Sequence, residues 1–337
     1  MRIVVGLLTI LIFVVVIGLL GLRLAASLRE IAILPGQVPA EGRVVETALG
    51  AIYVEEVGPE AGPVILLVHG SVGWSRMWRP TQQALADAGY RTIAFDMPPM
   101  GWSFRDAGGD YSRQTQGQRL LALVRALEVR PVVVAHSFGA GAAAEAAMSN
   151  PAALAGLIVV SGAIGLGGPD GGTPPWPLGN PFMRELAVSA TVTNPPAMGP
   201  LLRMFLHRKE AATPEVIEML LQPNRRPGTT SAIADWLTSL LVPPAGAGST
   251  TAEGWQAMTL PLAFIWGDRD TATPIAQGEA LADLTGAPLF ILDEVGHIPQ
   301  IEDPARFDAT LLAALAELMP GAIPAEAATP EPAAPNP

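Results

Sequence analysis

The chain has 337 residues, of which half are hydrophobic and 15% are charged, so a mostly disordered chain and a small disulfide-stapled scaffold are both excluded. Its net charge of −11 argues against a nucleic-acid partner, because such binding needs a basic surface. The absence of cysteine excludes disulfides, thiolate metal sites and a cysteine nucleophile. The length suits one large α/β domain or two small ones.

The amino-terminal segment predicts a membrane-spanning helix. Residues 3–22 are uncharged and mostly apolar, and about 20 residues at 1.5 Å each cross a hydrocarbon core of roughly 30 Å. A cleavable signal peptide is the alternative, but its apolar stretch is usually about 7 to 15 residues long. We therefore predict an uncleaved anchor within residues 1–30 and a membrane as its partner. Arginines flank both ends of the segment, so the positive-inside rule does not clearly decide the orientation of the helix in the membrane. We favour the orientation that places the domain outside the cytoplasm.

The segments that follow predict an α/β fold. Residues 44–49 and 51–57, separated by Gly50, read as two antiparallel strands. From residue 63 onward, short apolar runs alternate with helix-length segments, which predicts a mostly parallel, doubly wound sheet covered by helices. The predicted strands are 63–70, 90–98, 131–137, 154–163, 260–268 and 288–296, and the predicted helices are 78–89, 112–129, 138–150 and 304–319.

A long insertion, residues 164–260, interrupts the strand pattern and exceeds the length of a simple loop. It contains four short amphipathic stretches, at 182–191, 198–209, 214–222 and 229–242. We predict a helical cap that divides the core into residues 43–163 and 261–319. Its apolar side chains could line a substrate pocket or could be ordinary core of the cap; the candidates for the pocket are Trp176, Met204, Phe205 and Trp236.

The chain ends in residues 320–337, which are rich in proline and alanine. This composition offers too little apolar bulk to offset the entropy cost of ordering, so it predicts a disordered tail. A proline-rich ligand for a partner protein is the alternative.

Ser137 stands where the strand 131–137 meets an alanine-rich helix. A sharp strand-to-helix turn of this kind leaves the serine hydroxyl exposed, and it requires small residues two places to either side of the serine. Ala135 and Gly139 meet that requirement. The helix also aims free backbone amides and the positive end of its dipole at a developing oxyanion. The pattern predicts a nucleophile.

Asp270 and His297 follow the last two predicted strands. A serine hydroxyl needs an imidazole base, and the imidazole needs a carboxylate that holds its tautomer. The carboxyl ends of strands are also where ligand sites gather in open α/β sheets. Asp268, two residues earlier in the chain, is the alternative carboxylate.

Five motifs occur in order along the chain. They are HGSVG at residues 69–73, DMPPMGWS at 96–103, the turn at Ser137, the G-x-x-D-x-x-x-P run ending at Pro274, and G-H-x-P ending at Pro299. Together they resemble the α/β-hydrolase superfamily, in the serine branch whose core carries a helical cap. The resemblance covers roughly residues 43–319.

The resemblance implies Ser137 as nucleophile, His297 as base and Asp270 as its orienting acid. It also implies an oxyanion hole made by the backbone amides of Ser71 and Phe138. An epoxide or haloalkane hydrolase is disfavoured, because those relatives have aspartate at the nucleophile position.

Two positions depart from the family pattern. Ala135 replaces the more usual glycine of the elbow, a change that sterics should tolerate. Pro99 stands where glycine is common, and its φ is locked near −65°, so any positive-φ turn at that position is excluded. We therefore expect a different loop on that flank of the site.

The remaining polar candidates read as structural. We expect Asp96 to tie down its loop, His69 and His136 to be hydrogen-bonded, and His207 to belong to a solvated basic face. The four histidines have no metal-site spacing, and the glycine-rich stretch 165–172 lacks the strand-turn-helix context of a cofactor loop. We therefore expect neither a metal nor a cofactor.

The leading hypothesis is a membrane-anchored serine hydrolase that cleaves the carboxylic ester of a small hydrophobic substrate through an acyl-serine. The same triad could serve lactone, amide or carbon–carbon bond hydrolysis or perhydrolysis, and the fold does not choose among them. A catalytically silent, membrane-tethered binding module is the alternative from another class.

Overall fold

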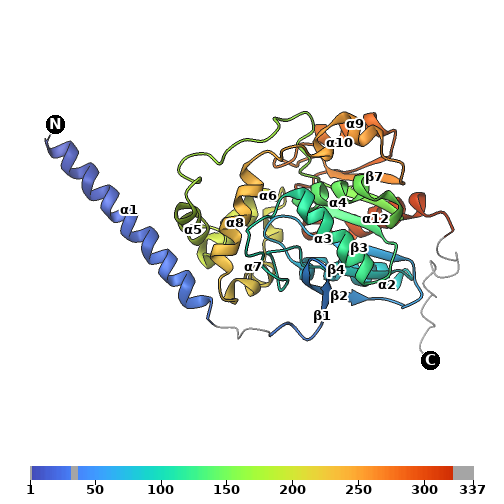
Figure 1. Cartoon of the computed structure of the whole chain (residues 1–337), viewed down its shortest axis with the longest axis horizontal. Coiled ribbons are helices and arrows are strands. Elements are labelled where there is room, and N and C mark those ends of the chain that lie inside the picture. The colour runs from blue at the N-terminus through green and yellow to red at the C-terminus, as the bar shows by residue number, and fades with distance from the viewer. Residues whose placement is uncertain (1, 32–36, 322–337) are drawn as a thin grey trace, which may run out of the picture.

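A sheet of eight strands forms the centre of the computed structural model, which describes residues 2–31 and 37–321 (Figure 1). The strand order is β1-β2-β4-β3-β5-β6-β7-β8. β1 and β2 are antiparallel, as are β2 and β4, and all the other neighbours are parallel. The strands are β1 Arg43–Thr47, β2 Gly50–Val57, β3 Val64–Val68, β4 Arg91–Phe95, β5 Val132–His136, β6 Gly156–Val160, β7 Leu262–Gly267 and β8 Leu289–Leu292. The mostly parallel sheet predicted from the sequence is thereby confirmed.

The central strands β5 and β6 appear in the sequence as continuous apolar runs, which is why they could be predicted. Every residue of β5 and of β6 is buried, because helices cover both faces of the sheet. Strands in that position read as continuous apolar runs rather than as alternating ones. Each of these strands lies within its predicted range.

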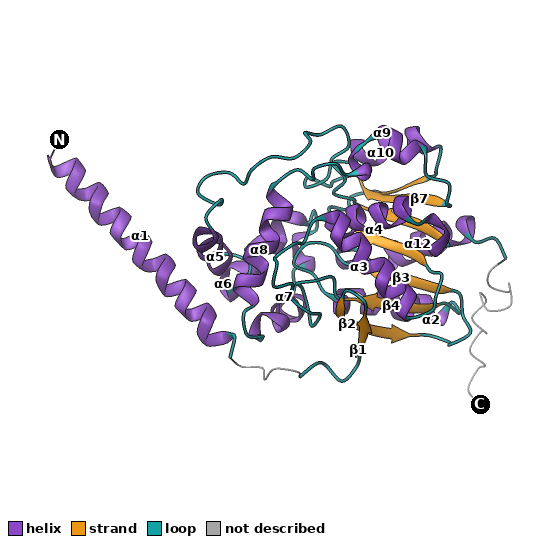
Figure 2. Ribbon diagram, in the orientation of Figure 1, coloured by secondary structure: helices purple, strands orange, loops and turns teal. Residues whose placement is uncertain are grey.

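Helices cover the two faces of the sheet (Figure 2). α3 and α4 pack together on one face, and α2 and α12 pack on the other. These helices are α2 Arg79–Asp87, α3 Arg113–Ala126, α4 Phe138–Ser149, α10 Ala276–Thr285, α11 Pro299–Glu302 and α12 Pro304–Leu318. α3 starts where the Ser112 side chain accepts a hydrogen bond from the amide of Thr115, and α12 starts at an equivalent cap by Asp303. The sequence reading did not include α10.

Four helices of the insertion gather between the sheet and the amino-terminal helix (Figure 1). They are α5 Pro181–Ala190, α6 Pro195–Phe205, α7 Pro214–Leu221 and α8 Thr229–Leu241. Each coincides with a predicted amphipathic stretch. The last helix of the insertion, α9 Ala252–Gln256, does not join these four helices but packs beside α10. Trp255 of α9 is fully buried against Phe264 of β7, with ring centroids 6.0 Å apart.

The amino-terminal helix α1, Arg2–Arg29, is long and apolar enough to cross a membrane, a test that a signal sequence would also pass. Residues 2–18 of α1 are exposed, whereas its carboxyl-terminal end contacts α5. The tail predicted at 320–337 lies outside the described residues from position 322 onward.

Candidate active site

Ser137 is the single residue between β5 and α4, and its backbone is unusual, with φ 53° and ψ −122°. Its amide donates to the carbonyl of Val160 at 3.0 Å, and its carbonyl accepts from the amide of Ala163 at 3.0 Å. A Cβ atom at Gly139 would lie 2.5 Å from the carbonyl oxygen of His69, so the turn requires glycine there. The sharp turn expected from the sequence is present.

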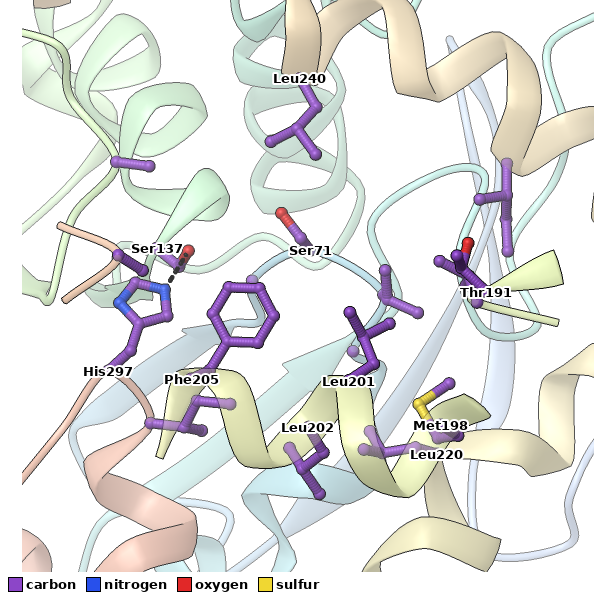
Figure 3. A pocket seen from close by; sticks show the side chains of 18 of the residues that line it. Ser71, Ser137, Thr191, Met198, Leu201, Leu202, Phe205, Leu220, Leu240 and His297 are labelled. Carbon is purple, nitrogen blue, oxygen red and sulfur yellow. Dashed lines mark hydrogen bonds between the residues drawn. The ribbon is translucent and has the colours of Figure 1, made fainter. Parts of the chain in front are cut away.

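The three predicted catalytic side chains form one hydrogen-bonded chain. His297 Nε2 lies 2.8 Å from Ser137 Oγ (Figure 3). On its other side, His297 Nδ1 lies 2.9 Å from Asp270 Oδ2. An ionised carboxylate can only accept, so Nδ1 carries the proton and Nε2 is free to accept the serine proton. All three residues are at least 94% buried, with exposed fractions of 6%, 5% and 5%. The geometry is that of a base poised on a nucleophile.

Hydrogen bonds hold Asp270 in its charged form. Oδ1 accepts from the amides of Ala272 and Thr273, both at 2.9 Å, and Oδ2 also accepts from the Thr273 hydroxyl at 2.7 Å. Burial alone would raise the pKa of Asp270, but the interaction with His297 and the bonds from Thr273 outweigh it, so this pKa lies below its usual value. Asp268, the alternative acid, instead accepts from the amide of Val295 at 3.4 Å.

Thr273 is a site residue that the sequence reading missed. Its hydroxyl lies 3.1 Å from His297 Nδ1, and it donates to Asp270. The position falls inside the motif that ends at Pro274, but the pattern alone assigns it no role.

The neighbouring histidines are structural, as expected. His69 Nε2 accepts from the amide of Met97 at 2.8 Å, and burial lowers the pKa of His69 to about 4. His136 Nε2 donates to the backbone carbonyl of His297 at 2.8 Å. Burial and then the proximity of His297 lower the pKa of His136 to about 3. His136 therefore stays neutral and holds the backbone of the base.

Asp96 ties down the loop after β4, as expected. Its carboxylate accepts from the amides of Ser75 at 2.7 Å and Trp102 at 2.6 Å, and burial raises the pKa of Asp96 to about 7. The positive φ of this loop falls at Gly101, with φ 54°, rather than at Pro99. A Cβ at Gly101 would lie 2.0 Å from Asp96 Oδ2, which explains the glycine.

A cavity of about 370 Å³ opens at the triad between the sheet edge and the cap (Figure 3). None of the described residues that line it is Asp, Glu, Lys or Arg. Ser71 contributes to the wall beside Ser137, and the cap supplies mainly aliphatic side chains. These include Ala187, Val188, Met198, Leu201, Leu202, Leu220, Ile233, Leu237 and Leu240.

The structure separates the four predicted pocket residues into two groups. Phe205 and Trp236 line the cavity. Trp176 and Met204 do not, because their side chains are 93% and 70% exposed. On α6 the inward face carries Leu201, Leu202 and Phe205, so Met204 points outward, and Trp176 lies in the loop before α5. The expectation for these two residues is thus corrected.

Glu302 joins the cap to the catalytic loop, a role that the sequence did not reveal. Its Oε2 accepts from the amides of His207 and Arg208, and its Oε1 accepts from the amide of Gly296, all at 2.9 Å. The amide of His297 itself donates to the carbonyl of Phe205, also at 2.9 Å. These hydrogen bonds therefore link the end of α6 to the loop that carries His297.

Comparisons with known proteins identify the family of this chain. Residues 65–310 match the sequence model of the Alpha/beta hydrolase family. A curated relative, the 2-hydroxymuconate semialdehyde hydrolase of Pseudomonas sp. (strain CF600), is 27% identical over 297 residues, which cover 86% of this chain and 99% of the relative.

Two solved structures share the fold at 22% identity. A membrane phospholipase A superposes with a TM-score of 0.65 and covers 94% of this chain and 98% of its own. A thermophilic esterase from Thermogutta terrifontis superposes with a TM-score of 0.64 and covers 83% of this chain and 99% of its own.

The replacement Glu302→Gln should loosen the link between cap and base. An amide group would put a donor where a buried backbone N–H now finds an acceptor, and an unsatisfied buried donor costs about 1 to 3 kcal/mol. We expect the free energy of unfolding to fall by that amount, measured by urea unfolding. Glu317→Gln, on the exposed side of α12, is the matched control. Equal stability of the two variants would contradict the role of Glu302.

Asp96 should make the stability depend on pH. The folded protein holds a proton on Asp96 below about pH 7, whereas the unfolded chain binds it only near pH 3.9. Between these values the folded state binds more protons, so the contribution of Asp96 to the free energy of unfolding rises as pH falls from 7 towards 4. Urea unfolding at pH 5 and pH 7.5 should show this difference in wild type and in Asp283→Asn, an exposed control, and a smaller one in Asp96→Asn. The same pH response in all three proteins would exclude Asp96 as its source.

Proposed function

This chain belongs to the alpha/beta hydrolase family, and we propose that it is a membrane-anchored serine hydrolase that cleaves uncharged carboxylic esters with a hydrophobic acyl or alcohol part. The observation that carries the proposal is the hydrogen-bonded chain of Ser137, His297 and Asp270 at the wall of a cavity whose described lining has no charged residue other than histidine.

The proposed reaction begins when His297 Nε2 takes the proton of Ser137 Oγ and the oxygen attacks the ester carbonyl. The backbone amides of Ser71 and Phe138 would hold the oxyanion. Ser71 lines the cavity and Phe138 is the first residue of α4, where amides are free of helical partners. Such donors are worth about 3 to 4 kcal/mol in other enzymes. His297 then protonates the leaving alcohol as the acyl-serine forms. His297 next takes a proton from a water that attacks the acyl-serine, and it returns this proton to Ser137 Oγ as the bond to the acyl group breaks and the acid is released.

The charge-free cavity favours a neutral substrate. The curated relative acts on 2-hydroxymuconate semialdehyde, whose name denotes a carboxylate. A carboxylate that enters an apolar cavity loses its hydration, and here no lysine or arginine of the described lining would compensate for that loss. Ester cleavage of a neutral substrate therefore fits this cavity better than carbon–carbon cleavage of such an anion.

The membrane anchor rests on α1. Its most apolar window has a mean hydropathy of 3.3 and no part of it is buried within the protein. Ala25-Ala26-Ser27 only weakly resembles a signal-peptide cleavage site. An uncleaved helix is favoured because Arg23 pairs with Glu185 of the cap at 2.8 Å, a contact that cleavage at that site would remove. A membrane phospholipase A has the same fold. We keep the proposal of a catalytic domain outside the cytoplasm.

A fluorophosphonate probe tests the nucleophile. Wild type, Ser137→Ala and the control Ser71→Ala are labelled and peptide-mapped, and each is assayed on p-nitrophenyl esters of increasing chain length. We expect label on Ser137, a loss of at least about 1000-fold in turnover for Ser137→Ala, and retained label in Ser71→Ala, because that change leaves the backbone amide in place. Turnover that survives in purified Ser137→Ala would refute the assignment.

A pair of esters that differ in one charge tests the substrate class. p-Nitrophenyl valerate and mono-p-nitrophenyl succinate present the same scissile bond on chains of similar length, but the succinate ends in a carboxylate. We expect kcat/KM to be at least about 100-fold lower for the succinate, because the cavity offers the anion no partner. 2-Hydroxymuconate semialdehyde should be a comparably poor substrate. Efficient turnover of either anion would contradict the neutral-ester proposal.

A further inference from the structure

The loop before α5 and the first turn of that helix expose large apolar side chains. Trp176, Phe182 and Met183, here called the cap patch, are 93%, 48% and 40% exposed. Trp176 and Met183 border the same surface hollow. Residues 173–183 contain no charged side chain. An exposed apolar patch of this kind marks an interaction surface rather than a solvated loop.

The cap patch lies next to the end of α1. Figure 1 shows α5 beside α1, and the two helices are in contact. Leu19, Leu22, Arg23 and Ala26 are partly or fully buried, a helical stripe that faces the cap. The stripe begins inside the apolar segment, so the last turn of that segment already touches the protein.

Polar contacts fix this arrangement. Arg23 Nε pairs with Glu185 of α5 at 2.8 Å, and Arg29 donates to the carbonyl of Thr193 at 2.7 Å. Glu30 accepts from the amides of Gly228 at 3.1 Å and Thr230 at 2.8 Å, at the start of α8. A carboxylate at the amino terminus of a helix is also favoured by the helix dipole. The end of α1 is therefore held to both α5 and α8.

These contacts set the depth of the cap patch. Arg23 is the first charged residue after the apolar segment 3–22, so in a bilayer it marks the headgroup level. Its partner Glu185 stands within one turn of Phe182 and Met183, a rise of about 5 Å. The headgroup region on each side of a bilayer is roughly 5 to 8 Å thick. Phe182 and Met183 therefore lie within that thickness of the headgroup level, and Trp176 borders the same hollow as Met183.

We propose that the cap patch inserts into the interface of the same bilayer that α1 spans, so that the cap is seated on the membrane; this rests on the proposed anchor. Tryptophan favours the interface between hydrocarbon and water, which suits Trp176. The inner face of α5 carries Ala187 and Val188, which line the catalytic cavity. One helix, about 10 Å thick, separates the cavity from α1. The substrate class is accordingly esters dissolved in the bilayer.

Site-specific fluorescence tests the contact directly, because the chain has no cysteine of its own. Full-length Phe182→Cys and the control Ile291→Cys are labelled with an NBD fluorophore and reconstituted into phosphatidylcholine vesicles with or without doxyl-labelled lipid. Ile291 has a matching exposure of 48% but belongs to β8, which pairs with β7 on the side away from α1 (Figure 1). We expect at least twofold stronger quenching, and a blue-shifted emission, for the probe at position 182.

Every outcome of this experiment decides the proposal. Equal quenching at the two positions in protein that floats with the vesicles overturns the cap contact and leaves the anchor standing. Protein that does not float overturns both. Self-quenching between labels at position 182 without quenching by doxyl lipid would show that a second copy of the chain covers the patch, and it also overturns the proposal. The measurement needs no turnover, so a failure of the proposed chemistry would not affect it.

Activity provides an independent readout. The triple variant Trp176→Ser/Phe182→Ser/Met183→Ser should lose about tenfold in turnover of a long-chain ester embedded in phosphatidylcholine vesicles and stay within twofold on a soluble short-chain p-nitrophenyl ester. The control variant Leu49→Ser/Ile291→Ser replaces two exposed apolar side chains of the α/β domain, outside the cap. It should leave the turnover of both esters unchanged. An equal loss on both substrates would show a general structural defect and would count against membrane seating.

Discussion

The backbone of Ser137 is the constraint on which the rest of the site depends. A non-glycine residue at φ 53° is strained, and it persists only where the surroundings fix it. Here β5 and α4 hold it from both sides, and its amide and carbonyl both bond to the segment of β6 and beyond. The space for the turn comes from Gly139 and from Gly70, where a Cβ would approach Ser137 Cβ to 2.8 Å. The fold therefore supplies the strained turn that fixes the position of the Ser137 hydroxyl.

The cap is held at two edges by different means. At one edge Glu302 and the carbonyl of Phe205 join α6 to the loop of the base, and at the other the end of α1 holds α5 and α8. Movement of α6 away from the sheet would break bonds that position His297. Polar contacts with segments outside the cap therefore restrain both of these edges.

The sequence predicted the features that depend on local sequence pattern. It did not predict the residues whose roles depend on partners far away in the chain. Buried strands and the sharp turn at Ser137 have signatures in composition and spacing, so the sheet and that turn could be predicted from the sequence. Thr273 and Glu302 have no such signature, because their roles exist only once a distant group comes within hydrogen-bond distance. Phe205 and Met204 are adjacent in sequence, and only the rotation of α6 decides which of them faces the cavity.

The site has few permanent charges, which favours an uncharged substrate. Burial keeps His69 and His136 neutral at physiological pH, since their pKa values lie near 4 and 3. The charged groups that the described cavity would contain during reaction are then the oxyanion, the His297 imidazolium and the adjacent Asp270 carboxylate. Charges interact more strongly where water and other ions are excluded, so each one counts for more in the transition state. A permanent charge on the substrate would weaken that contrast, which supports the proposed preference for neutral esters over anionic ones.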